Sequence, residues 1–315
     1  MLHTPICDLI GITYPVFQGG MAWIADGRLA AAVSNGGGLG IIAAGNADGN
    51  YVREQIRVAK SLTDKPFGVN IMLLSPFADE VAKVVLEEQV AVVTTGAGNP
   101  SKYIKDWLSA GIKVIPVVAS CSMAKLMERM GASALIAEGG ESGGHIGEVS
   151  TMPLVPQVVD AVSIPVLAAG GIGDGRGVAA AFMLGACGVQ VGTRFLVAYE
   201  CNIHPTYKEK ILKATDISTI TTGKRLGHPV RSLKTPFSRD YAKAEYDSSI
   251  SNEELEAMGT GALRLAVQEG DTQHGSFLAG QISGMIRKEQ PAAEIVQELC
   301  TEAEAVLKGA TKWVR

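Results

Sequence analysis

The order of apolar and polar positions along the chain follows two recurring patterns. Eight short segments are almost continuously apolar, at residues 16–19, 39–43, 67–71, 90–94, 113–118, 134–137, 166–169 and 189–191. Runs of this kind are typical of parallel strands that are covered on both faces. Between them, apolar residues recur at helical spacing, as in 52–62 and 81–85. The pattern predicts eight strand–helix units in succession.

This succession favours an α/β fold, a (β/α)8 TIM barrel, with a doubly wound open sheet as the alternative. From 204 to 247 the chain becomes polar, mixed in charge and interrupted by prolines, which indicates an insertion after strand 8. Helical patterns resume at 253–267 and 294–307, and we expect both segments to complete the barrel's outer ring. The predicted domains are a barrel of residues 1–203 and 276–315 and an inserted cap, on the substrate side, of residues 204–275.

Composition narrows the class of protein. The chain has 315 residues, of which 47% are hydrophobic and only 5% aromatic, and this suits a large core of small aliphatic side chains. A net charge of −4 argues against broad nucleic-acid binding, and no apolar run is long enough to span a membrane. Five cysteines without a C-x-x-C pair and five histidines without ligand spacing predict a reducing compartment and no metal site. Without a signal-peptide pattern, we expect a soluble cytoplasmic protein.

Glycines at the ends of the last two predicted strands point to a phosphate-binding site. Gly170 and Gly171 follow strand 7, and Gly192 and Thr193 follow strand 8. In parallel barrels the loops leaving these strands usually hold a phosphate, because backbone N–H groups at a helix start face the anion. A single glycine pair more often makes only a tight turn, but several polar, glycine-rich loops here should line one pocket. A phosphorylated cofactor is the leading hypothesis.

In the loop Ala137–Gly147, glycines surround one imidazole, that of His145. Histidine titrates near neutrality, so at a barrel mouth it is a candidate acid, base or oxyanion partner; a solvated loop histidine is the alternative. We expect Asp174 to cap a helix rather than to take part in chemistry. Glu138 and Glu141 support a paired-carboxylate hydrolase only weakly. The remaining histidines have no comparable setting: His3, His204, His228 and His274.

Seven stretches spread over nearly the whole chain carry a family resemblance. They are residues 17–23, 37–42, 65–77, 93–103, 143–147, 169–172 and 190–195, which read FQGGMAW, GGLGII, KPFGVNIMLLSPF, VTTGAGNPSKY, GGHIG, AGGI and QVGTRF. Together they resemble the flavin-dependent enoyl-[acyl carrier protein] reductases of bacterial fatty acid synthesis, a branch of the nitronate monooxygenase-like FMN barrels. Ser142 and Gly173, at positions where alanine is frequent, and the changed turn 119–121 put substrate detail in doubt.

The resemblance implies that FMN lies across the barrel mouth. Its ring system would lie near Gly20, Met21, Ala22 and Asn70, with Glu138 and Gly143 along its edge, and its phosphate would meet Gly171, Gly192 and Thr193. The implied cofactor contacts also include Gly144, Gly170 and Gln190. His145 matches the family's active-site histidine, and 279–282 looks like a family segment close to the flavin.

The implied reaction is the reduction of a trans-2-enoyl-acyl carrier protein to acyl-acyl carrier protein, the last step of the fatty acid elongation cycle. NADH or NADPH reduces FMN, which then passes hydride to the β-carbon of the enoyl thioester. His145 and N–H groups of its loop are candidates to stabilise the enolate, and histidine or water protonates the α-carbon. The resemblance also implies a bacterial cytoplasmic homodimer, with dependence on a monovalent cation left open.

The implied partner, acyl carrier protein, is acidic, so we expect a basic landing surface. Basic residues outnumber acidic ones in the insertion: Lys208, Lys210, Lys213, Lys224, Arg225, Arg231, Lys234, Arg239 and Lys243. An ordinary solvated surface explains the same residues equally well.

Three other functions fit parts of the pattern. A nitronate monooxygenase is the alternative function, since it uses the same barrel, FMN and a histidine but passes electrons to oxygen. The segments around Asn70 and 94–103 favour the reductase. An inosine monophosphate dehydrogenase type of barrel is disfavoured because 138–147 has no cysteine nucleophile. A non-catalytic flavin-binding scaffold is the third reading, and His145 with the phosphate site argues weakly against it.

Overall fold

Eight parallel strands form the centre of the structure, a computed structural model that describes residues 2–313. Their order is β1-β9-β8-β6-β5-β4-β3-β2, and a bridge between Phe17 and Leu39 brings β1 beside the segment that leads into β2. The strands are β1 (Val16–Gln18), β2 (Ile41–Ala43), β3 (Gly68–Met72), β4 (Val92–Gly96), β5 (Lys113–Val118), β6 (Leu135–Glu138), β8 (Val166–Ala169) and β9 (Gly188–Val191). Each overlaps one predicted segment. The predicted TIM barrel is therefore confirmed, and the open sheet is wrong.

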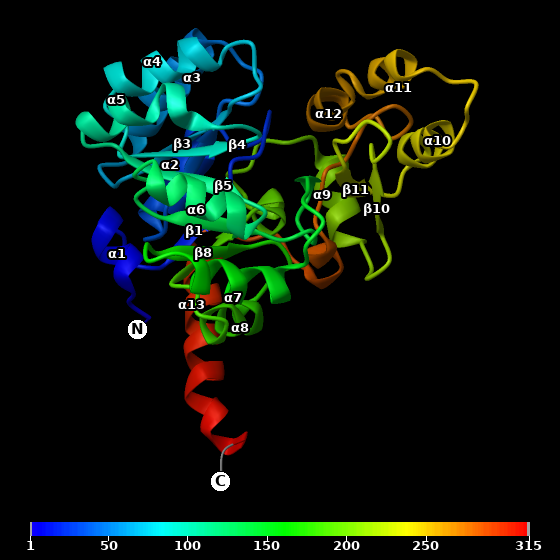
Figure 1. Cartoon of the computed structure of the whole chain (residues 1–315). Helices are drawn as coiled ribbons and strands as arrows, with labels where there is room; N and C mark the ends of the chain where they lie inside the picture. Colours follow the sequence, from blue (N-terminus) through cyan, green and yellow to red (C-terminus); the bar gives the residue numbers. More distant parts are fainter. Residues whose placement is uncertain (1, 314–315) are drawn as a thin grey trace.

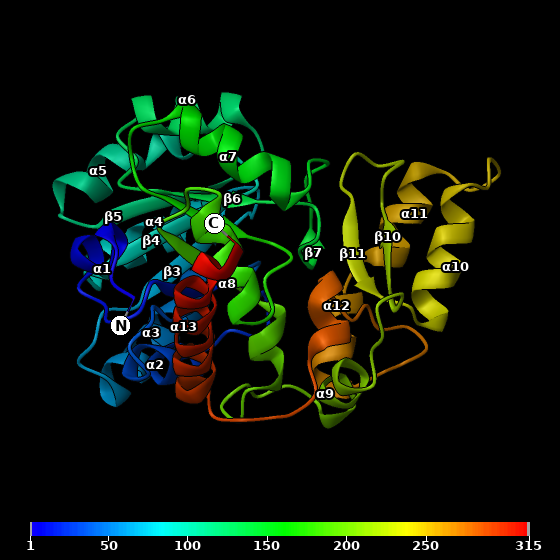
Figure 2. The same ribbon diagram turned by 90° about the horizontal axis from the view of Figure 1, so that it is seen from below.

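Helices surround the barrel as an outer ring (Figure 1). They are α2 (Gly27–Asn35), α3 (Gly49–Leu62), α4 (Ala78–Glu87), α5 (Ile104–Ser109), α6 (Cys121–Arg129), α7 (Thr151–Ala161), α8 (Gly175–Met183) and α13 (Ala292–Gly309). The short α1 (Pro5–Ile10) precedes the first strand. Asp174 caps α8 as predicted, because its carboxylate accepts hydrogen bonds from the N–H groups of Arg176 and Gly177. In the view from below, α13 lies alongside α8 and α2 and so completes the ring (Figure 2).

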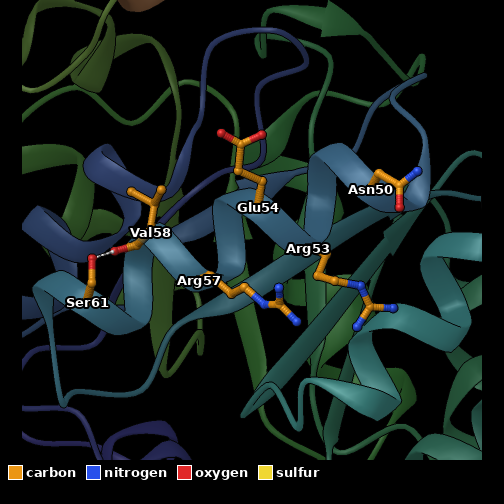
Figure 3. Close-up of a pocket in the computed structure, with 6 residues that line it drawn as sticks. All are labelled: Asn50, Arg53, Glu54, Arg57, Val58 and Ser61. Atoms are coloured by element: carbon orange, nitrogen blue, oxygen red, sulfur yellow. Dashed lines mark hydrogen bonds between the residues drawn. The ribbon is translucent and has the colours of Figure 1, made fainter.

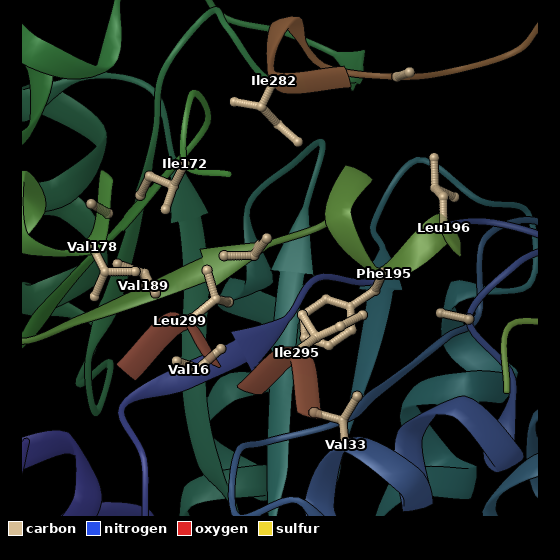
Figure 4. Packing of buried hydrophobic residues seen from close by; sticks show 14 of the residues in the cluster. Val16, Val33, Ile172, Val178, Val189, Phe195, Leu196, Ile282, Ile295 and Leu299 are labelled. Atoms are coloured by element: carbon tan, nitrogen blue, oxygen red, sulfur yellow. The ribbon is translucent and has the colours of Figure 1, made fainter. Parts of the chain in front are cut away.

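The main core fills the space between the barrel and its last helices. Val16 of β1 and Val189 of β9 are fully buried, and Phe195 packs in the same cluster as Ile295 and Leu299 of α13 (Figure 4). Burial of each such side chain contributes about 1.5–3 kcal/mol relative to an exposed one. The C-terminal helix thus fixes the chain just after β9, where a phosphate site is predicted.

After β9 the chain builds an inserted lobe beside the barrel, with α10 and α11 on its far side (Figure 1). The segment contains η2 (Thr193–Val197), α9 (Pro205–Leu212), β10 (Thr219–Thr222), β11 (Val230–Leu233), α10 (Pro236–Glu245), α11 (Asn252–Gly259), α12 (Ala262–Arg264) and η3 (Leu265–Glu269). Further short helices are η1 (Pro100–Lys102), η4 (Gln281–Met285) and η5 (Ala310–Trp313). A second sheet has the order β10-β11-β7, and its third strand, β7 (Gly144–His145), comes from the barrel.

The expectation that 253–267 completes the outer ring is wrong. Leu255 of α11 is fully buried against Tyr241 and Ala244 of α10, in a small core of the lobe itself. Helical spacing shows that one face of a segment is buried, but it does not show which partner covers that face. Of the two helical patterns, only 294–307 joins the ring. Within residues 2–313 no helix is both long and apolar enough to cross a membrane.

Candidate active site

The predicted site residues line one cavity of about 770 Å³ at the carboxyl ends of the barrel strands. These residues are Gly20, Met21, Ala22, Asn70, Glu138, Gly143, Gly144, His145, Gly170, Gly171, Gln190, Gly192 and Thr193. The lobe contributes Gly227, His228, Pro229 and Leu263 to the same wall. A separate surface depression on α3 (Figure 3) holds Arg53 and Arg57, whose charges are already paired with carboxylates of Glu87 and Glu88. The predicted site residues thus gather at the barrel mouth and not in this depression.

The ends of β1 and β3 meet in close contact at one side of the cavity. A Cβ added at Gly20 would lie 2.4 Å from the Cβ of Asn70 and 2.8 Å from its Cγ, so only glycine fits there. Parallel pairing of β3 with β4 places Asn70 opposite Thr94, and the Asn70 amide donates a hydrogen bond to Thr94 Oγ1 at 2.9 Å. Strand register thus fixes the orientation of the Asn70 amide at the cavity wall.

The loops after β8 and β9 form the opposite side. Gly170 and Gly171 both have positive φ, +85° and +71°, a conformation that L side chains rarely adopt. After Gly192 the helix η2 begins without a side-chain cap, and a Cβ at Gly192 would come no closer than 3.8 Å to Met21. Consecutive turns of this kind expose backbone N–H groups to an anion. The space and the donors therefore fit a phosphate.

Two carboxylates near the His145 loop have different surroundings. Glu141 accepts hydrogen bonds from both the N–H and the Oγ1 of Thr151, and so it ties the loop to α7. Glu138 ends β6 inside the cavity, where loss of water raises the pKa of its carboxyl to about 7, against a smaller opposite effect of Ser142. A carboxyl with this pKa is part protonated near neutrality and can donate or accept a hydrogen bond. The two groups do not act as one hydrolytic pair.

His145 is the predicted catalytic residue, and the structure adds a second imidazole beside it. β7 pairs with β11, so His145 lies opposite Val230, and His228 lines the cavity two residues before Val230. Partial loss of water lowers the pKa of the His145 imidazole, with a smaller contribution from His228, although the side chain still reaches solvent. Both effects favour the neutral form of the imidazole. His228, which has no predicted role from the sequence, therefore belongs to the cavity, and that prediction is corrected.

The loop after β1 also touches the lobe. Trp23 has a positive φ of 64°, and the guanidinium of Arg264 in α12 lies 5.3 Å from the centre of its ring. Such a cation–π contact stabilises by about 0.5–1 kcal/mol at an exposed position. Gly280 and Ile282, from the segment 279–282, also line the cavity.

The predicted basic surface is only partly free. Lys208 donates to the carbonyl of Ala198 and pairs with Glu289, and its side chain is only 12% exposed. Arg231 donates twice to the carbonyl of Gly140, at 2.9 and 3.2 Å. These two residues hold the structure together rather than offer charge to a partner.

Comparison with known proteins places this cavity in a family. Residues 3–84 and 75–302 match the nitronate monooxygenase family. The chain is 50% identical to FabK of Thermotoga maritima, with a TM-score of 0.97 and full coverage of both chains. It is 31% identical over 350 residues to a probable nitronate monooxygenase of Staphylococcus aureus, covering 96% of this chain and 98% of the relative.

A second kind of relative is a (3aS,4S,5R,7aS)-5-hydroxy-7a-methyl-1-oxo-octahydro-1H-indene-4-carboxyl-CoA dehydrogenase of Mycobacterium tuberculosis, which is 41% identical over 237 residues. That match covers 74% of this chain and 67% of the relative, so the chain spans about two thirds of that protein. Proteins with differently named activities are therefore similar in sequence to this chain. The chain belongs to the nitronate monooxygenase family.

Proposed function

We propose that this protein is an FMN-dependent enoyl-[acyl carrier protein] reductase that takes its electrons from NADH or NADPH. The observation that carries this proposal is its likeness to FabK, an enoyl-[acyl carrier protein] reductase, at 50% identity over the whole of both chains. A TM-score of 0.97 means that the barrel, the inserted lobe and the cavity between them share one arrangement. The reaction class therefore follows the relative with 50% identity rather than the one with 31%.

The family implies a flavin, and the residues of the cavity suit FMN. Gly20 packs against Asn70 on one side, and the glycine turns at Gly171 and Gly192 offer backbone N–H groups for a phosphate on the other. A cavity of about 770 Å³ suits a cofactor together with part of a substrate. FMN, when bound, would carry hydride from the nicotinamide to the alkene.

The chain's own residues then act on the substrate. Hydride addition to the β-carbon breaks the C=C π bond and moves its electron pair onto the thioester oxygen, and a proton adds at the α-carbon. His145 lines the cavity, and an N–H of its imidazole can donate a hydrogen bond to that oxygen. The glycine loop that carries His145 is held by Glu141 and by Arg231, which limits its movement.

Anaerobic reoxidation tests the proposal. Protein loaded with FMN should bleach on addition of NADH or NADPH, and a crotonyl thioester should restore the yellow colour without oxygen. A reduced protein that no enoyl thioester reoxidises would refute the reductase function. Reoxidation only by oxygen in the presence of a nitronate would instead support the second candidate, nitronate monooxygenase, which the family match and the Staphylococcus aureus relative favour.

Acyl carrier protein is the proposed partner, with a docking surface near the lobe's hairpin. Lys224 is exposed in the same hairpin loop as His228, and Lys213 and Lys234 are exposed elsewhere on the lobe. Reversal of these three lysines to glutamate should weaken reduction of a carrier-linked substrate more than that of a coenzyme A thioester. Equal effects on both substrates would refute this docking surface. The homodimer and the monovalent-cation dependence stay predictions.

A further inference from the structure

His145 and His228 face the same cavity because two distant segments pair as strands. In the antiparallel pair of β7 and β11, His145 lies opposite Val230 and Gly144 opposite Arg231. The pairing extends one step further, since the N–H of Ile146 donates to the carbonyl of Pro229 at 3.0 Å. His228 lies two residues before Val230, the pairing partner of His145, and both imidazoles line the cavity, so the two residues are diagonal neighbours at the end of the ribbon. Diagonal neighbours are within reach of ring side chains.

The backbone that carries His228 is firmly held. Its N–H donates to the carbonyl of Gly223 at 3.1 Å, which closes the hairpin loop. The carboxylate of Glu245, only 6% exposed in α10, accepts from the N–H groups of Gly223 and Arg225 at 3.1 and 2.7 Å. Pro229 follows and restricts the backbone further. His228 is therefore positioned by the lobe's own core rather than by a free loop tip.

We propose that His228 is a second catalytic residue, which together with His145 donates hydrogen bonds to the thioester carbonyl oxygen of the substrate. This inference rests on the proposed reductase function. Charge develops on that oxygen as hydride reaches the β-carbon, and two fixed N–H donors stabilise it better than one. One imidazole comes from the barrel's own loop and the other from the inserted lobe, so the lobe supplies part of the oxyanion site as well as a wall.

Separate half-reactions test the role of His228. In stopped-flow measurements on holoenzyme, H228A should reduce its flavin with NADH at the wild-type rate. Reoxidation by crotonyl-coenzyme A should be slower by about 100-fold, the usual effect of removing one oxyanion donor. H228Q keeps an N–H donor and should lose less than H228A. H274A serves as the matched control, because His274 is an exposed lobe histidine paired with Asp271 and does not line the cavity.

The outcomes separate cleanly. Selective loss in the oxidative half-reaction, with wild-type behaviour of H274A, supports the second imidazole. Equal loss of rate in both half-reactions would show that His228 has a structural role. Equal loss in H228A and H228Q would show that a hydrogen bond from this position does not contribute. Either result overturns the inference. So does a wild-type rate in H228A. If wild-type reduced enzyme itself fails to reduce the enoyl thioester, the proposed function fails first, which is a different result.

Discussion

Substitution of Gly20 by alanine tests the cofactor wall directly. The new Cβ would lie 2.4 Å from the Cβ of Asn70 and 2.8 Å from its Cγ, well inside any tolerated contact. Either Asn70 moves and loses its 2.9 Å hydrogen bond to Thr94, or the loop after β1 moves away from the cavity. Overpacking of this kind costs about 1–3 kcal/mol. Since each 1.4 kcal/mol changes an equilibrium constant tenfold, we expect FMN affinity to fall by about 5- to 150-fold.

Titration of the apoprotein with FMN, followed by flavin fluorescence, measures this change. Gly259→Ala is the matched control, because its added Cβ makes only an ordinary 3.6 Å contact with Tyr241, far from the cavity residues. Asn70→Gly removes the atom that clashes, so G20A should weaken FMN binding little further in an N70G background. Wild-type affinity of G20A for FMN, or fully additive effects of G20A and N70G on that affinity, would show that residue 20 does not clash with Asn70.

Three further predictions concern charge and contact at the cavity mouth. In folded apoprotein the pKa of Glu138 is about 7, above its ordinary 4.5, so the folded state holds the extra proton between these values and stability falls as pH rises through them. In thermal unfolding, the stability of E138Q should fall less over this pH range than that of the wild type. Parallel stability–pH curves for the two proteins would contradict the raised pKa of Glu138. Burial lowers the pKa of His145, and His228 lowers it further, so H228A should raise the His145 pKa in an NMR titration. An unchanged pKa would show that the two imidazoles do not interact. A double-mutant cycle of Trp23→Ala and Arg264→Ala, measured by urea unfolding, should give a coupling of about 0.5–1 kcal/mol, and additive effects would deny the contact.

The barrel could be predicted from the sequence because its strands are buried on both faces. Such strands are continuous apolar runs, and their positions in the sequence closely match those of the structure, from β1 to β9. The same reasoning grouped the cavity residues, since every parallel strand directs its following loop to one end of a barrel. Contacts that follow from strand direction alone can therefore be predicted from the sequence.

Other contacts depend on pairing between segments that are far apart in the sequence, and these contacts could not be predicted from it. The segment 253–267 shows a helical pattern whether it packs on the barrel or on α10, so its place was assigned wrongly. His228 looks like any loop histidine until β7 and β11 are paired. The only local signal was the run Val230–Leu233 that follows it, which has strand character but names no partner. Trp23 and Arg264 meet for the same tertiary reason.

The pairing of β7 with the lobe also changes how the insertion should be viewed. A cap that only covered the substrate would leave the catalytic loop to the barrel, yet here His145 is part of the lobe's own sheet. Val230 is the pairing partner of His145. The neighbouring Arg231 donates a hydrogen bond to the carbonyl of Gly140, at the start of the loop that carries His145. Any shift of β11 relative to the barrel would therefore move His145 as well as His228. A change in the insertion would therefore alter the positions of reacting groups as well as the shape of the entrance, because the lobe's sheet holds one imidazole and the lobe supplies the other.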